Sequence, residues 1–169
     1  MRVGQAVLMD RESMRAAFDD VFDQAVVFHG FADHMRDYDV YVYATAAPSS
    51  GITPGHLRYR FIHCVQATVT TTLGGGSWRQ SLGDELTDLD EWERSGEPDG
   101  FLWGVRWHNL YPGMQLQPDS HETRRWSETV GIPFHEVLIQ TNAHSIMLVF
   151  SDLRVTPVDD GTTPFRVEG

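Results

Sequence analysis

The chain has 169 residues, of which 41% are hydrophobic and 22% are charged, and this composition fits one globular domain with a single core. Twenty-four acidic residues against 13 basic ones, all of them arginine, give a net charge of −11. A negative surface repels phosphate backbones and anionic lipid head groups, so we expect neither nucleic-acid nor membrane binding, whereas a basic protein partner is compatible with the charge.

Cys64 is the single cysteine, so no intrachain disulfide can form, and this suits a reducing compartment. The first residues lack the apolar run of a secretion signal. The longest purely apolar stretch, Ile146 to Phe150, is too short to cross a bilayer. We therefore expect a cytoplasmic protein.

The first predicted element is a helix from Asp10 to Gln24, with Asp10 as its N-cap. Its apolar residues recur at steps of three and four: Met14, Ala17, Phe18, Val21, Phe22 and Ala25. We expect the Phe18/Phe22 stripe to pack on the core or on a partner.

Strands are predicted next, at Ala25 to Phe28 and at Asp37 to Ala46. The second strand has the alternation of a half-buried strand, in which Tyr38, Val40 and Val42 share one face. A turn is predicted from Pro48 to Gly55.

Leu57 to Leu73 is predicted to form two strands with a bend at His63-Cys64. An exposed edge strand from Thr68 to Leu73 could support a homodimer, although nothing in the sequence requires one. The glycines Gly74 to Gly76 indicate a flexible turn, because the lysine and hydroxyl residues of a phosphate loop do not follow them.

A second helix is predicted around Leu82 to Arg94, and one of its faces is strongly acidic. That face carries Asp84, Glu85, Asp88, Asp90, Glu91 and Glu93. It has two interpretations, a solvated helix face or a surface that binds a basic partner and accelerates association. A calcium loop is not favoured, because Glu93 stands where that loop needs glycine.

Phe101 to Leu110 is predicted to be a strand with Trp103 and Trp107 on one face and Arg106 and His108 on the other. Large aromatic residues at this spacing are typical of a core. The alternative is an exposed platform that binds a small ligand or a sugar ring, with Arg106 and His108 orienting an anion.

A third helix is predicted from Asp119 to Val130, where Asp119 and Glu122 form a capping box and Gly131 ends the helix. Phe134 to Thr141 and Ser145 to Phe150 then form a predicted hairpin. A short strand from Asp152 to Val158 follows. We expect residues 159–169 to be a loose tail.

Seven or eight strands with three helices that do not alternate regularly with them argue against a parallel α/β sheet. The predicted fold is mainly β: an antiparallel β-sandwich with an N-terminal helix and two inserted helices. The chain is predicted to be one domain, 1–169, with its core at about 10–158.

His29, Asp33 and His34 were the candidates for a metal site, but neither helix nor strand spacing brings the two histidines to one face. A turn histidine bonded to backbone is favoured, and we predict no metal and no cofactor. Cys64 follows His63, yet adjacent strand residues point to opposite faces, so they do not form a nucleophile and base pair. We predict no catalytic residues.

Four segments between residues 25 and 158 carry a family resemblance: VVFHGFADHMRDYDVYVY, YRFIHCVQATVTTT, WGVRWHNLYPGM and GIPFHEVLIQTNAHSIMLVFSDLRV. Together they resemble the YxiG-like domain family of bacterial proteins. The final strand pair is also similar to small polymorphic-toxin immunity domains. This resemblance implies an immunity or partner-binding role and supplies no catalytic residues.

The sequence therefore predicts a non-enzymatic protein-binding domain, in its most specific form an immunity-type protein that neutralises a basic toxin. The alternative is a small-ligand or carbohydrate-binding module that uses the aromatic strand. A third interpretation, a hydrolase built on dispersed histidines, requires a pocket where two or more of them converge.

Overall fold

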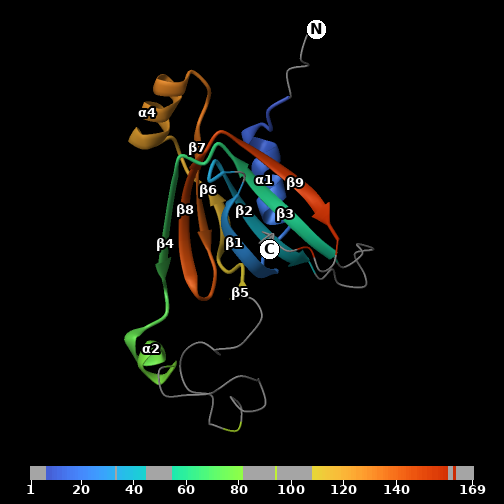
Figure 1. Cartoon of the computed structure of the whole chain (residues 1–169), viewed down its shortest axis with the longest axis vertical. Helices are drawn as coiled ribbons and strands as arrows, with labels where there is room; N and C mark the ends of the chain where they lie inside the picture. The colour runs from blue at the N-terminus through green and yellow to red at the C-terminus, as the bar shows by residue number, and fades with distance from the viewer. Residues whose placement is uncertain are drawn as a thin grey trace, which may run out of the picture.

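The structure, a computed structural model, describes residues 7–32, 34–44, 55–81, 94, 108–159 and 162. It is mainly β, with three described helices (Figure 1). In chain order the elements are α1 Arg11–Asp19, β1 Ala25–Ala32, β2 Asp37–Ala44, β3 Gly55–Ile62, β4 Gln66–Thr71, α2 Gly75–Ser81, β5 His108–Asn109, β6 Gly113–Leu116, α4 His121–Val130, β7 His135–Gln140, β8 His144–Phe150 and β9 Asp152–Val158.

The strands form two antiparallel sheets. Sheet A has the order β5-β1-β2-β3-β9, and sheet B has the order β4-β8-β7-β6. Consecutive strands lie in different sheets at four steps of the chain: β3 to β4, β4 to β5, β5 to β6 and β8 to β9. The predictions of antiparallel pairing and of a β7–β8 hairpin are both confirmed.

Strand β2 lies at the centre of sheet A and is buried on both faces. Tyr38, Val40 and Val42 point into the core as the alternation predicts. The expectation of a half-buried strand is wrong, because Asp39 on the other face is only 2% exposed. Arg60 on the neighbouring strand shields that carboxylate and binds it with two hydrogen bonds of 2.7 and 2.8 Å.

Helix α1 begins as predicted, with the Asp10 carboxylate accepting a hydrogen bond from the Ser13 N–H at 2.8 Å. It ends at Asp19, earlier than the predicted Gln24. The chain turns there, so Phe22 leaves the apolar stripe and is 53% exposed. Of the predicted Phe18/Phe22 stripe, only Phe18 packs in the core.

One hydrophobic core joins the helix and the two sheets. The ring of Phe61 in β3 lies 4.9 Å from that of Phe150 in β8, and 6.2 Å from that of Phe18 in α1, measured between centroids. The hydroxyl of Tyr59 also donates to the Ala17 carbonyl at 2.6 Å. The position of α1 is thus fixed by side chains from sheet A.

The bend predicted near His63 is the first crossing between the sheets, and His63 adopts a positive φ of 47° there. Its backbone N–H donates to Asp37 at 2.9 Å. Its ring Nδ1 lies 2.8 Å from the hydroxyl of Ser151, which sits at the crossing from β8 to β9. The two crossings are therefore side by side.

Helix α4 is capped by Ser120 and not by the predicted Asp119. The Ser120 side chain accepts from the Thr123 N–H, and the Thr123 side chain accepts from the Ser120 N–H. Gly131 ends the helix in the left-handed conformation, as predicted. Strand β6, which pairs with β7, was not predicted.

Several predictions fall partly or wholly on residues outside those described: the turn at 48–55, the acidic helix, most of the strand at 101–110 and the tail. Within the described part, Gly75 and Gly76 open helix α2 and do not form the predicted flexible turn. No described helix is long and apolar enough to span a membrane.

The buried ion pair between Asp39 and Arg60 yields a stability prediction. Asp39→Ala leaves the Arg60 guanidinium without its carboxylate, so we expect the free energy of unfolding in urea to fall by about 3 to 5 kcal/mol. Glu122→Ala, which removes the exposed pair with Arg125, is the control and should have a much smaller effect. Equal losses in the two variants would contradict this account.

Candidate functional site

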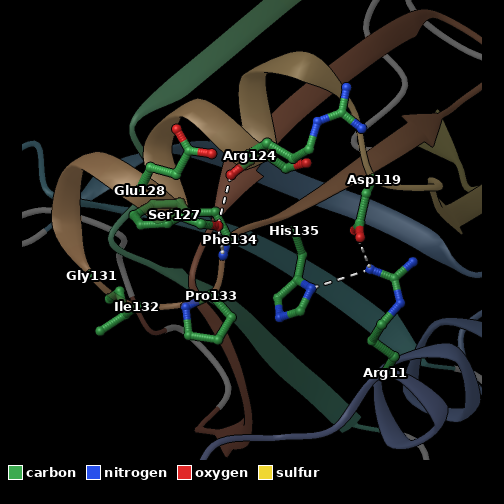
Figure 2. A pocket seen from close by; sticks show the side chains of 11 residues that line it. Arg11, Asp119, Arg124, Ser127, Glu128, Gly131, Ile132, Pro133, Phe134 and His135 are labelled. Atoms are coloured by element: carbon green, nitrogen blue, oxygen red, sulfur yellow. Dashed lines mark hydrogen bonds and ion pairs between the residues drawn. The ribbon is translucent and has the colours of Figure 1, made fainter.

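An open cleft lies where the start of α1 meets α4 and the segment that follows α4 (Figure 2). We call it the apical cleft; its volume is about 680 Å³. Its polar lining comprises Arg11, Asp119, Thr123, Arg124, Ser127, Glu128 and His135, and Gly131, Ile132, Pro133 and Phe134 complete the wall. Arg11 at the start of α1 and one later segment, from Asp119 to the start of β7, supply these residues.

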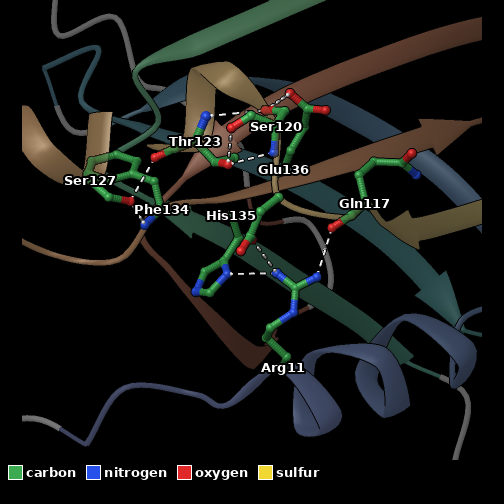
Figure 3. A network of polar contacts seen from close by, with 9 residues as sticks. Arg11, Gln117, Ser120, Thr123, Ser127, Phe134, His135 and Glu136 are labelled. Carbon is green, nitrogen blue, oxygen red and sulfur yellow. Dashed lines mark hydrogen bonds and ion pairs between the residues drawn. The ribbon is translucent and has the colours of Figure 1, made fainter. Parts of the chain in front are cut away.

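Arg11, the first residue of α1, holds the cleft together (Figure 3). Its Nη2 donates to the Gln117 carbonyl at 2.8 Å, and its Nη1 lies 3.2 Å from the His135 Nδ1 atom. The same nitrogen is 3.6 Å from the Asp119 carboxylate. A single guanidinium thus ties α1 to the segment before α4 and to the start of β7.

The contact with Arg11 defines the protonation of His135. A guanidinium can only donate hydrogen bonds, so the His135 Nδ1 atom accepts and the ring is neutral with its proton on Nε2. Burial lowers the pKa of His135 below its ordinary value of 6.5, and the charge of Arg11 lowers it further. His135 therefore presents an N–H donor to the cleft.

Helix α4 is fixed to β7 by hydroxyl groups (Figure 3). The Ser127 hydroxyl donates to the Thr123 carbonyl at 2.7 Å and accepts from the Phe134 N–H at 2.9 Å. The Ser120 hydroxyl donates to Glu136 at 3.3 Å. These bonds set the width of the cleft, and they also occupy the Ser127 hydroxyl.

The chemistry of the apical cleft favours binding over catalysis. The Nε2 atom of His135 carries a proton in this tautomer, so it can donate to a ligand but cannot abstract a proton without losing the Arg11 contact. Asp119, Arg124 and Glu128 are exposed and provide charges of both signs. The Cys64 thiol is buried, and burial raises its pKa to about 12, so it is not a ready nucleophile.

A second pocket of about 730 Å³ shares Ile132 with the apical cleft. Its apolar wall includes the exposed Val7 and Leu8. His63 lines it as well, and because the Ser151 hydroxyl donates to the Ile62 carbonyl at 3.2 Å, its oxygen accepts from the His63 ring. The Nδ1 atom of His63 thus donates, whereas the Nδ1 atom of His135 accepts.

The open edge of sheet B is a different kind of candidate surface. Residues Thr68 to Thr71 of β4 are exposed, and Val69 is 44% exposed. The Thr72 N–H donates toward β8, to the Ala143 carbonyl at 2.8 Å. Since successive residues of a strand direct their backbone groups to opposite edges, Ala67, Val69 and Thr71 direct theirs away from β8.

The sequence-predicted site residues are mostly not described by the structure. The acidic set from Asp84 to Glu93 lies outside the described residues, as do Trp103, Arg106 and Trp107, so both sites stay predictions. The backbone of His108 lies in β5, opposite Val26.

Of the three candidate metal ligands, the structure describes His29 and His34, and Asp33 lies outside the described residues. The Nδ1 atom of His29 bonds the Tyr38 hydroxyl at 2.7 Å, and His34 lies in the turn after β1. Among the described residues, no three histidine, cysteine or acidic side chains gather as metal ligands would. The contact between Arg11 and His135 was not predicted, because the two residues are 124 positions apart.

The described part of the chain is mainly β and has an open cleft beside α1 and α4. The chain belongs to the YxiG-like protein family, whose sequence profile matches residues 10–168. The predicted family resemblance is therefore confirmed.

Neither curated proteins nor solved structures assign a function to this chain. No curated protein matches the chain. An uncharacterized protein from Neisseria gonorrhoeae, known from a crystal structure, is similar at 9% identity with a TM-score of 0.39. The match covers 81% of this chain and 93% of that one.

The neutral state of His135 predicts a pH dependence. Because its folded pKa is lowered, the unfolded state binds more protons, and the contribution of His135 to stability is present near neutral pH and is lost as pH falls through and below 6.5. His135→Gln keeps an acceptor for Arg11 and does not titrate. We expect this variant to lose less unfolding free energy than the wild type between about pH 7 and about pH 5. The exposed His121→Gln is the control, and an identical change of slope in both variants would contradict the assignment.

Proposed function

We propose that this protein is a non-enzymatic protein-binding domain whose partner adds a strand to the open edge of β4. The observation that carries the proposal is the exposure of β4, whose outer backbone groups pair with no described strand along an uncharged stretch, Gln66 to Leu73. Strand addition uses such an edge: backbone hydrogen bonds give affinity, and alternate side chains give specificity.

The other sheet edges support this choice by contrast. Strand β9 carries Asp152, Arg154 and Pro157, and charge and proline are the usual means of blocking an edge. Strand β6 contacts α1, and β5 has only two residues. Within the described part of the chain, β4 is the edge that lacks these protections.

The charge of the chain favours a basic partner. A net charge of −11 raises the rate at which a positively charged protein associates, and it adds salt dependence to binding. A toxin-neutralising role is the specific form of this proposal that the resemblance to immunity domains suggests. The protonated Nε2 atom of His135 and the buried thiol of Cys64 support the proposal that the protein is not an enzyme.

For the fold we infer a β-sandwich. The support is that Phe61 of sheet A and Phe150 of sheet B meet in one core, to which both sheets contribute buried side chains. In this arrangement β4 lies at the margin of sheet B, which explains why Val69 faces the core side of its sheet and is still exposed.

Val69→Pro tests the strand-addition proposal. Proline removes an N–H that points to the open edge and leaves the bonds of β4 to β8 in place, so the fold should be retained while strand addition is blocked. We expect proteins captured from native-cell lysate by the wild type, and identified by mass spectrometry, to be lost with Val69→Pro.

Val69→Thr is the matched control, because it changes the side chain and keeps the N–H, and it should retain the partner. Circular dichroism and thermal unfolding confirm that each variant is folded. Capture that persists with Val69→Pro, or that is lost equally with Val69→Thr, would argue against backbone pairing at β4. Repeating the capture at moderate salt should weaken binding of a basic partner.

A further inference from the structure

Three arginines gather on the outer face of sheet A, the face turned away from the shared core. Arg58 and Arg60 are two residues apart in β3, so their side chains share this face. In the pairing of β3 with β9, Arg58 stands opposite Thr156 and Arg60 stands opposite Arg154. We call these four residues the arginine face.

The arginine face has more positive charge than the described carboxylates neutralise. Asp39, opposite Arg60 in β2, is held by both bonds from that arginine. Arg154 is exposed, and neither it nor Arg58 forms an ion pair with any residue that the structure describes. Like charges directly opposite each other in a sheet are destabilising, as Arg60 and Arg154 are here.

Two buried donors on this face also lack acceptors. The Arg58 Nε and the Thr156 Oγ1 atoms are buried and have no hydrogen-bond partner. An N–H and a hydroxyl can both donate, and they lie on directly opposed residues of adjacent strands. A buried donor without a partner is costly, so the arrangement calls for an acceptor that the described chain does not provide.

We propose that the arginine face binds a small molecule through a phosphate group, with Arg58, Thr156 and Arg154 as donors. A phosphate has several acceptor oxygens and can accept from donors on two strands at once, which a single side-chain carboxylate reaches less well. Its negative charge also reduces the electrostatic repulsion between Arg60 and Arg154, which lie opposite each other in the β3–β9 pair. The overall charge of −11 disfavours a nucleic acid, whose many phosphates extend beyond this local patch.

This inference is independent of the partner site on β4, because it concerns β3 and β9 of the other sheet. The test is isothermal titration calorimetry of the full chain with inorganic phosphate, and with acetate at matched ionic strength. We expect saturable binding of phosphate and no binding of acetate. Acetate binding as tightly as phosphate, or the absence of saturable phosphate binding up to about 10 mM, would overturn the proposal.

Three variants locate the binding. Arg154→Gln, at an exposed position, should weaken phosphate binding about tenfold or more. Thr156→Val removes the unpartnered hydroxyl at nearly constant volume; it should weaken phosphate binding without lowering the melting temperature of the free protein. Arg124→Gln, in the apical cleft, is the control and should bind as the wild type does. Loss of binding in Arg124→Gln with retention in Arg154→Gln would place the phosphate elsewhere and overturn the assignment.

Discussion

Phe61 lies between two aromatic rings that belong to different layers of the molecule. On one side it meets Phe18 of α1, and on the other it meets Phe150 of sheet B. Aromatic contacts of this kind combine a large buried area with a defined geometry, so they fix orientation as well as distance. Contacts of this one side chain therefore link the helix, sheet A and sheet B.

The apical cleft follows from that arrangement. Once α1 is seated on Phe61 and Tyr59, its first turn reaches the segment before α4, and Arg11 can bond both Gln117 and His135. The Met9 N–H adds a bond of 2.9 Å to Asp152 at the start of β9. The cleft is thus a consequence of packing between elements. Its histidine is neutral because burial disfavours the charged ring and because α1 places the cation of Arg11 beside it.

The sequence predicted those parts of the fold that local patterns control. The alternation in β2, the cap at Asp10, the stop at Gly131 and the β7–β8 hairpin all depend on residues a few positions apart. The prediction was wrong where two adjacent residues can both cap a helix, because Ser120 and not Asp119 caps α4.

Such local patterns do not predict the candidate sites. Arg11 meets His135 only through tertiary packing, and Arg58 meets Thr156 only through the pairing of β3 with β9. No spacing rule connects these residues. The exposed edge at β4 was the exception, because its run of threonines is visible in the sequence and the structure shows it to be exposed.

The paired crossings at His63 and Ser151 have a consequence for the order of folding. The bond between them joins residues 88 positions apart, and β3 pairs with β9 over a similar separation. Bringing such distant segments together costs loop entropy before any contact compensates for it, and folds dominated by distant pairings form slowly. The β1–β2 and β7–β8 hairpins can form early from chain neighbours, whereas the two sheets acquire their final registry only when Ile62 and His63 meet Ser151. A nascent chain that has emerged only as far as β4 therefore contains the three central strands of sheet A and lacks every partner of β4.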